Sequence, residues 1–206
     1  ILGYMESILE NPNLDPQRQR FFVDRSFQQA KRLSALLKDI STLNKMDEAK
    51  RLFEKEPSNL YEVVSDVLKD VNLQIEQKEC TTINKVMSDC EIQGNRSLLY
   101  SIFRNLIDNA LAYGGEKLTI EINCYREDEQ FYYFSFSDNG IGVAEEHLSK
   151  LFERFYRVDK GRSRKVGGTG LGLAIVKNAV LFHRGNISAK NVPGGGLRFI
   201  FSLRKH

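Results

Sequence analysis

The segment Asp138-Asn139-Gly140-Ile141-Gly142 lies one residue after the aromatic run Phe131–Phe136, which predicts a buried strand at the centre of a sheet. A carboxylate at the end of such a strand can accept a hydrogen bond from a bound molecule, and the glycines beside it let the backbone approach that molecule closely. An ordinary Asp-Asn-Gly turn would look the same in isolation. The segment therefore gains meaning only from the rest of the chain.

A second glycine-rich segment, Gly167-Gly168-Thr169-Gly170-Leu171-Gly172-Leu173, opens a predicted amphipathic helix that runs to Phe182. Backbone amides at a helix N-terminus bind phosphate, because free N–H groups and the positive end of the helix dipole coincide there. The glycine spacing fits neither a Rossmann fingerprint nor a Walker loop. The intervening basic segment, which includes Arg157, Lys160 and Arg162, suits a triphosphate; a solvated basic loop is the alternative.

A third segment, Asn105-Leu106-Ile107-Asp108-Asn109-Ala110, lies on a predicted helix that ends at Tyr113-Gly114-Gly115. Asn105 and Asn109 are four residues apart and share one helix face. Two amides there suggest a polar ligand, such as Mg²⁺ held through a side-chain carbonyl, although solvent-facing amides are equally compatible with the pattern. Tyr113 could stack on a base or fill the core. Together, the three segments indicate an ATP site.

Composition excludes several other classes. The 206 residues are 41% hydrophobic and 28% charged with a net charge of +3, which fits a globular protein and gives no argument for nucleic-acid binding. Three histidines are too few for a typical zinc centre, and the three cysteines are expected to be free thiols. No apolar run could span a bilayer. The chain opens on Ile1 without an initiator Met, so we expect a fragment of a longer protein.

Local signals predict an α+β architecture in two parts. Residues 1–10 and 16–46 form helices separated by a break at 11–13, with Asp15 as N-cap before Pro16. The long helix has little neighbouring chain to cover its apolar stripe, so a hairpin that dimerises into a four-helix bundle is expected; packing on its own globular domain is the alternative. The stripe consists of Leu33, Leu36, Ile40 and Leu43. Residues 51–206 then form a two-layer α/β sandwich with helices on one side of a mixed sheet.

The second part resembles the ATP-binding catalytic domain of sensor histidine kinases, which shares its fold with gyrase-type ATPases. Four boxes of that family follow in order: the N box at 105–113, the G1 box at 138–142, the F box at 151–157 and the G2 box at 168–173. Residues 1–50 resemble part of the dimerisation and phosphotransfer hairpin. The resemblance implies a homodimer, a response regulator receiver domain as partner, and the cytoplasmic portion of a sensor that reaches a membrane only through segments outside this chain.

The resemblance also implies roles for individual residues. Asn109 would hold Mg²⁺, Asp138 would bind the adenine amine, and Tyr113 would lie near the base. Arg157 would balance charge on the γ-phosphate, and an amide at Asn105, where gyrase-type ATPases carry a Glu, favours transfer to a protein histidine over hydrolysis. The segment 153–168 would form a lid. The remaining nucleotide-binding positions are Gly140, Gly142, Lys160, Arg162, Gly168, Thr169, Gly170, Leu171 and Gly172.

Two departures from the family pattern matter. Ala112 stands where a Lys or Arg is usual, and the acceptor His is absent, since the family pattern places it shortly before Ile1. The fragment is therefore expected to bind Mg-ATP without phosphorylating itself. Two rival functions remain: a hydrolytic ATPase of the gyrase and mismatch-repair type, and a nucleotide-binding regulatory scaffold without kinase activity.

Overall fold

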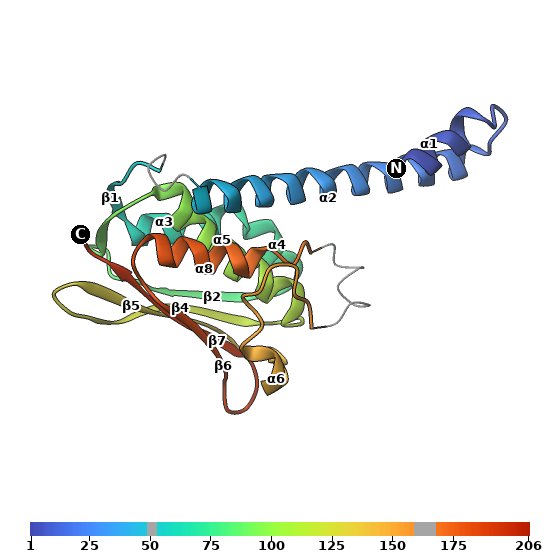
Figure 1. Ribbon diagram of the computed structural model, residues 1–206. Helices are drawn as coiled ribbons and strands as arrows, with labels where there is room; N and C mark the ends of the chain where they lie inside the picture. The colour runs from blue at the N-terminus through green and yellow to red at the C-terminus, as the bar shows by residue number, and fades with distance from the viewer. Residues whose placement is uncertain (49–52, 159–167) are drawn as a thin grey trace.

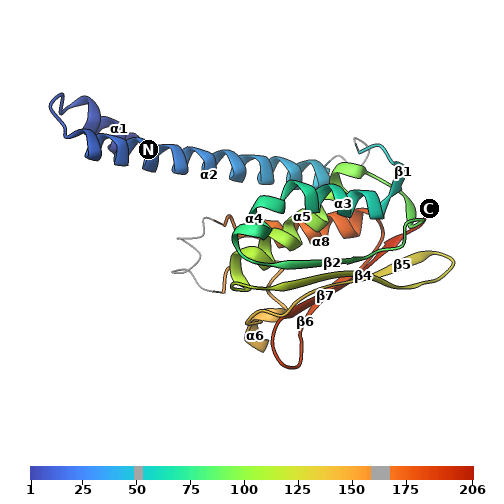
Figure 2. The ribbon, with the colours of Figure 1, turned by 180° about the vertical axis from the view of Figure 1, so that it is seen from behind.

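The N-terminal part is a helical hairpin in the computed structural model, which describes residues 1–48, 53–158 and 168–206. Helix α1 (Leu2–Leu9) packs against helix α2 (Pro16–Glu48). The carboxylate of Asp15 accepts a hydrogen bond from the backbone N–H of Arg18 at 3.2 Å, which confirms the predicted helix start. Figures 1 and 2 show that most of α2 projects away from the rest of the molecule.

The remaining residues form the sheet domain (residues 53–158 and 168–206). Its main sheet has the strand order β2-β4-β5-β7-β6, in which β2 pairs with β4 in parallel and the other pairs are antiparallel. The strands are β2 (Thr81–Lys85), β4 (Thr119–Glu127), β5 (Phe131–Asp138), β6 (Ile187–Asn191) and β7 (Leu197–Arg204). The aromatic strand β5 is central, as predicted.

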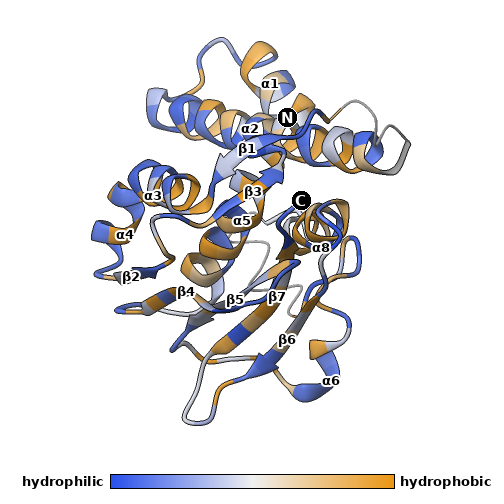
Figure 3. Cartoon of the chain, turned by 90° about the vertical axis from the view of Figure 1, so that its left-hand side faces the viewer, coloured by the Kyte–Doolittle hydropathy of each residue, from blue (hydrophilic) through white to orange (hydrophobic). Residues whose placement is uncertain are grey.

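Three helices cover one face of this sheet: α3 (Leu60–Asp70), α5 (Arg96–Tyr113) and α8 (Gly172–Phe182). Figure 3 shows these helices above the sheet, with apolar residues along α5 and α8. Phe103 of α5 meets Phe134 and Phe201 edge-on, and those two rings stack at 5.2 Å between centroids. The predicted two-layer α/β sandwich is confirmed.

Several smaller elements complete the sheet domain. Helix α3 is separated at the fully buried Val71 from the short helix α4 (Asn72–Gln77). Strand β1 (Glu56–Asn59) pairs with β3 (Glu91–Gly94). A short helix, α6 (Glu145–Leu148), follows the loop after β5.

The apolar stripe of α2 is divided between two environments, which corrects the expectation that it lacks a cover within its own chain. Leu43 and Met46 are buried, and Leu36 and Ile40 are half-buried against the same core, where α2 packs on α8. Leu33, by contrast, is half-exposed, together with Phe21, Val23, Phe27 and Leu37. The alternative of packing on the sheet domain is thus correct for the C-terminal end of α2.

Candidate nucleotide-binding site

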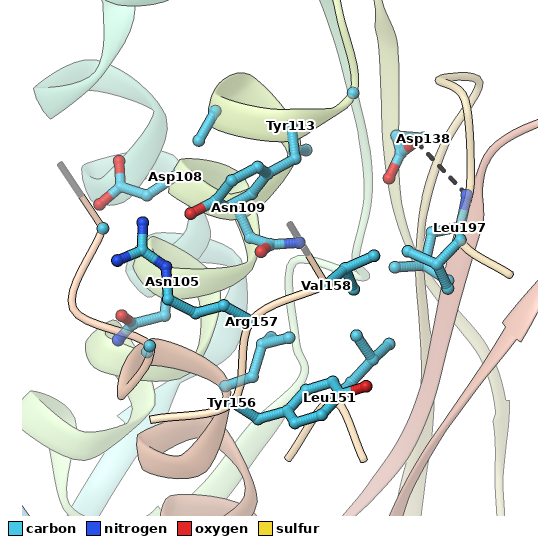
Figure 4. Close-up of a pocket in the computed structure, with 18 of the residues that line it drawn as sticks. Asn105, Asp108, Asn109, Tyr113, Asp138, Leu151, Tyr156, Arg157, Val158 and Leu197 are labelled. Atoms are coloured by element: carbon cyan, nitrogen blue, oxygen red, sulfur yellow. Dashed lines mark hydrogen bonds between the residues drawn. The ribbon is translucent and has the colours of Figure 1, made fainter. Parts of the chain in front are cut away.

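A cavity of about 590 Å³ opens between the C-terminal half of α5, the end of β5, the segment 151–158 and the start of α8. Figure 4 shows side chains from all of these elements directed into one space. Ten predicted site residues line it: Asn105, Asn109, Tyr113, Asp138, Gly142, Arg157, Gly168, Thr169, Gly170 and Gly172. The fold thus brings together the three segments that the sequence analysis singled out.

Asp138 closes one end of the cavity and is only 7% exposed. Its Oδ1 atom accepts hydrogen bonds from the backbone N–H of Gly140 at 2.9 Å and of Leu197 at 3.3 Å. Burial raises the pKa of this carboxyl group, and the two backbone hydrogen bonds oppose that rise. Because both bonds use Oδ1, the second oxygen, Oδ2, is the atom that could accept a hydrogen bond from a ligand amine.

Gly140 does not line the cavity, contrary to the prediction that it approaches a ligand. A Cβ atom at this position would lie 2.6 Å from the carbonyl oxygen of Gly114 at the end of α5. The glycine therefore allows two backbones to meet, the loop after β5 and the C-terminus of α5. It acts on the site indirectly, by holding Asp138 against the helix that carries Tyr113.

The glycine turn (residues 168–172) joins the F box through the backbone. Gly170 has a φ of 75°, and its carbonyl oxygen accepts a hydrogen bond from the N–H of Phe155 at 2.8 Å. A Cβ at Gly170 would lie 3.0 Å from the backbone of Phe155, so a side chain there would both strain φ and crowd the contact. Phe152 meets Phe199 of the core edge-on at 6.1 Å, which anchors the start of the segment.

Leu171 was predicted as a binding residue, but the structure places it elsewhere. Its side chain is fully buried in the core, and its N–H donates to the Thr169 hydroxyl oxygen at 3.2 Å. Helix α8 starts at Gly172, where a Cβ would lie 2.7 Å from Oδ1 of Asn105. Lys160 and Arg162, also predicted to bind phosphate, lie outside the described residues.

The asparagines of α5 differ in their surroundings. Asn105 donates its side-chain N–H to the carbonyl of Ser101 at 2.7 Å, which orients its oxygen toward the start of α8. Asn109 and Tyr113 project into the cavity (Figure 4), and the Tyr113 hydroxyl lies close to Gly168. Tyr113 therefore bridges the end of α5 and the glycine turn, a contact that the sequence could not predict.

Arg157 crosses the cavity toward α5 (Figure 4). Its Nε and Nη2 atoms are buried and have no hydrogen-bond partner among the residues that the structure describes. Buried guanidinium donors without an acceptor are costly, so this arrangement suits an anionic ligand that supplies the acceptors. Of the predicted site residues, Arg157 carries the clearest signal for an anion.

Two further polar side chains of the cavity were not predicted as site residues. Asp108 lines the wall beside Asn109, and its carboxylate pairs with Nε of Arg104 at 2.8 Å. Tyr156 also lines the cavity, and its hydroxyl lies 2.6 Å from Nδ1 of His147 on α6. The helical spacing of Asp108 from Asn105 and the place of Tyr156 in the F box were the available signals.

No cluster of three or more His, Cys, Asp or Glu side chains occurs within residues 1–48, 53–158 and 168–206. The oxygen donors of Asn109 and Asp108 fit the sparse protein ligation typical of Mg²⁺, which takes most of its ligands from phosphates and water. In the same ranges, no helix combines the length and apolar character needed to cross a membrane.

Comparisons with known proteins agree with this geometry. Residues 94–206 match the family described as histidine kinase-, DNA gyrase B-, and HSP90-like ATPase. The chain is 34% identical to the phosphate regulon sensor protein PhoR of Pseudomonas aeruginosa, over 97% of this chain and 45% of that protein. It is 33% identical to the sensor histidine kinase WalK of Bacillus subtilis, over 98% and 33%. The chain thus spans between a third and a half of these relatives.

Solved structures show the same fold. The histidine kinase AdeS of Acinetobacter baumannii aligns over 100% of this chain and 93% of its own, with a TM-score of 0.76 at 24% identity. Histidine kinase ThkA, solved in complex with the response regulator protein TrrA, aligns over 98% of this chain and 57% of its own, with a TM-score of 0.74 at 21% identity. The chain belongs to the histidine kinase-, DNA gyrase B- and HSP90-like ATPase family and carries the catalytic domain of a sensor histidine kinase.

Proposed function

We propose that this chain binds Mg-ATP in the cavity and transfers the γ-phosphoryl group to a histidine of the dimerisation domain, for relay to an aspartate of a response regulator. Residues 1–50 would be part of the dimerisation and phosphotransfer hairpin, and residues 51–206 the catalytic domain. One observation carries the proposal. Arg157, whose buried donors lack an acceptor among the described residues, lines the same cavity as Asp138.

Different residues bind different parts of the nucleotide. Oδ2 of Asp138 accepts a hydrogen bond from the exocyclic amine of adenine and thereby selects it over guanine. Free amides at the start of α8 and the guanidinium of Arg157 bind the phosphates. Asn109, with Asp108 beside it, would hold Mg²⁺, which neutralises charge on the phosphate oxygens when bound.

In the transfer step, the imidazole nitrogen of the acceptor attacks the γ-phosphorus while the bond to the β,γ-bridging oxygen breaks and ADP leaves. Arg157 stabilises the charge that builds up on the transferring group and the leaving oxygen. Asn105 carries a neutral amide, which is too weak a base to deprotonate a water molecule, and one of its N–H groups donates to the carbonyl of Ser101. This favours transfer over hydrolysis.

Two of the three histidines, His147 and His183, are already engaged in hydrogen bonds. His183 is buried, with Nδ1 2.7 Å from the carbonyl of Ala179 and Nε2 accepting from the N–H of Asn95 at 3.1 Å. Nδ1 of His147 is engaged with Tyr156. In line with the family pattern, we propose that the acceptor belongs to a part of the dimerisation domain outside this chain, and that this chain belongs to the cytoplasmic portion of a membrane-anchored sensor.

Two partners belong to the proposal. The exposed apolar side chains of α2, among them Phe27, Leu33 and Leu37, support a homodimer through the hairpin. The ThkA–TrrA complex supports a receiver domain as the second partner. Light scattering that finds only a monomer at micromolar concentration would contradict the homodimer.

Calorimetric titration with Mg-ATP tests the binding step. Asp138→Asn keeps the shape of the side chain but replaces the acceptor charge, and we expect ATP affinity to fall by roughly 10- to 100-fold, the value of a hydrogen bond to a charged group. Asp89→Asn, at an exposed position, is the matched control and should bind like the parent. An unchanged affinity in Asp138→Asn would remove this residue from the adenine contact.

A label-transfer experiment tests the reaction. The chain is mixed with an acceptor-bearing hairpin from the full-length protein and with ATP labelled in the γ-phosphate. We expect label on histidine, recognised because phosphohistidine survives alkali and is lost in acid. Rapid release of phosphate without labelled protein would instead favour a hydrolytic ATPase, and binding with neither outcome would favour the regulatory scaffold.

A further inference from the structure

A hydrogen bond joins the helical hairpin to the glycine turn at the edge of the cavity. The hydroxyl of Thr169 donates to Oδ2 of Asp39 on α2, at 2.9 Å, across 130 residues of sequence. The same hydroxyl oxygen accepts the N–H of Leu171, so its proton is committed to Asp39. The side chain of a cavity residue is thereby held by a carboxylate from outside the sheet domain.

The packing of α2 brings this carboxylate to the turn. Asp39 directly precedes Ile40 and lies one helical turn from Leu36 and Leu43. It therefore lies beside the apolar residues of α2 that pack on the sheet domain, where α2 meets α8. The side chain is half-buried there. The contact therefore exists only while the C-terminal end of α2 is docked.

The charge of Asp39 conflicts with the expected ligand. Burial raises the pKa of this carboxyl group, while the Thr169 hydrogen bond and the charge of Lys38 oppose the rise. Asp39 thus depends on Thr169 for compensation in a site that disfavours its charge. A polyphosphate in the cavity would bring further negative charge to the glycine turn and would compete for the hydroxyl.

We infer that Asp39 couples the hairpin to the nucleotide cavity: its carboxylate and a nucleotide phosphate compete for Thr169, so that docking of α2 weakens phosphate binding. This inference rests on the proposed ATP site. By linkage, a bound nucleotide must loosen the docking of α2 by the same factor. While α2 is docked, Asp39 would occupy the Thr169 hydroxyl of the glycine turn. Bound ATP would weaken this contact and so help to release the sheet domain from α2.

Charge-removing variants test the first half of this coupling. Asp39→Asn keeps a side-chain oxygen that can accept from Thr169 but removes the charge, and Asp39→Ala removes both. We expect Mg-ATP to bind about fivefold or more tightly to Asp39→Asn than to the parent, and at least as tightly to Asp39→Ala. Adenosine, which has no phosphate, should bind all three proteins equally.

Asp24→Asn is the matched control. It makes the same charge change on the same helix, at an exposed position about 22 Å along the helix axis from Asp39. We expect it to bind Mg-ATP like the parent. Circular dichroism melts of each variant check that the fold is retained.

A distance measurement tests the reciprocal effect. Spin labels are placed at Lys31→Cys on α2 and Lys190→Cys on β6, both exposed, with Cys80 changed to Ser. We expect one narrow distance distribution in the parent without nucleotide and a broader one with Mg-ATP. The Asp39→Ala protein, which lacks the acceptor for the Thr169 hydroxyl, should show broadening already without nucleotide.

The outcomes separate this inference from the proposed function. If the parent binds no ATP, both fail. If the parent binds ATP but Asp39→Asn binds it equally or more weakly, only the coupling is wrong. An equal gain in adenosine affinity, or a distance distribution that ATP leaves unchanged, would likewise overturn the competition while leaving the ATP site intact.

Discussion

The two ends of the cavity are built differently. At the purine end, Asp138 continues the central strand and is fixed by hydrogen bonds to two backbone amides. At the phosphate end, Arg157 keeps buried donors without partners among the described residues, and Thr169 is held by a helix from the other part of the chain. The purine end thus has its hydrogen bonds in place before a ligand binds, whereas the phosphate end carries a positive charge that only a ligand can compensate.

This difference has a physical basis. The purine presents the same few neutral hydrogen-bonding groups throughout a reaction, so a rigid core can hold its partner in place. The phosphates bring several negative charges that change during transfer, and the groups that meet them must be free to pair at that moment. Variants at each end should therefore fail in different ways.

The largest effect is expected at the phosphate end. Arg157→Gln removes the guanidinium and should slow phosphoryl transfer by about a thousandfold, or about 4 kcal/mol, while ATP affinity changes far less. Transfer of labelled phosphate to an acceptor fragment measures the rate, and calorimetry measures the affinity. Arg126→Gln, on the β4–β5 hairpin, is the control. If affinity and rate fall together, Arg157 binds ground state and transition state alike.

At the purine end, a change should act through the fold. Gly140→Ala places a methyl group 2.6 Å from the Gly114 carbonyl oxygen, and we expect a loss of about 2 kcal/mol in the free energy of unfolding, as for overpacked sites. Urea denaturation measures it. Gly3→Ala, where nothing lies within 4 Å on helix α1, should not destabilise the protein and should raise its stability by up to about 1 kcal/mol. A fully stable Gly140→Ala protein would show that this backbone contact is adaptable.

A smaller effect should follow from the titration of His183, which is buried at the C-terminal end of α8. Burial lowers the pKa of His183 to about 4, from 6.5 in an unfolded chain. The neutral ring fits the core, so its contribution is complete above pH 6.5 and is lost as the pH falls toward 4. Between pH 7 and pH 5 the free energy of unfolding should drop by about 2 kcal/mol from this group.

The matched test replaces His183 with Gln and repeats urea denaturation at both pH values. The variant should be less stable at pH 7, because the hydrogen bonds to Asn95 and Ala179 are altered, but its stability should depend less on pH. If the free energy of unfolding depends on pH identically in parent and variant, groups other than His183 cause the loss of stability at low pH.

Much of the fold was predictable because its signals are local. The cap at Asp15 and the aromatic run of β5 both depend on neighbouring residues, and the structure confirms them. The prediction for α2 was wrong at its C-terminal end, because helical periodicity shows that a face is apolar but not what covers it. Leu43 is 2% exposed and Leu37 is 59% exposed, although both are apolar residues of one helix.

The candidate site followed the same division. Residue type and spacing identified Asp138, Asn109, Arg157 and the glycine turn, since carboxylate, amide, guanidinium and free backbone each imply a chemistry. They did not reveal that Gly140 serves packing or that the amide of Leu171 is already bonded to Thr169. Asp108 and Tyr156 were missed because their positions depend on how α5, α6 and the F box meet.

The sequence by itself determined which chemical groups this protein possesses and the order in which strands and helices carry them, because those properties reside in single residues and short periodic segments. Only the tertiary structure decided which groups share a cavity, which oxygen of Asp138 is left for a ligand, and that Asp39 reaches Thr169. Such facts depend on contacts between residues far apart in the chain, and these contacts are set by the packing of α2 and α5 against α8.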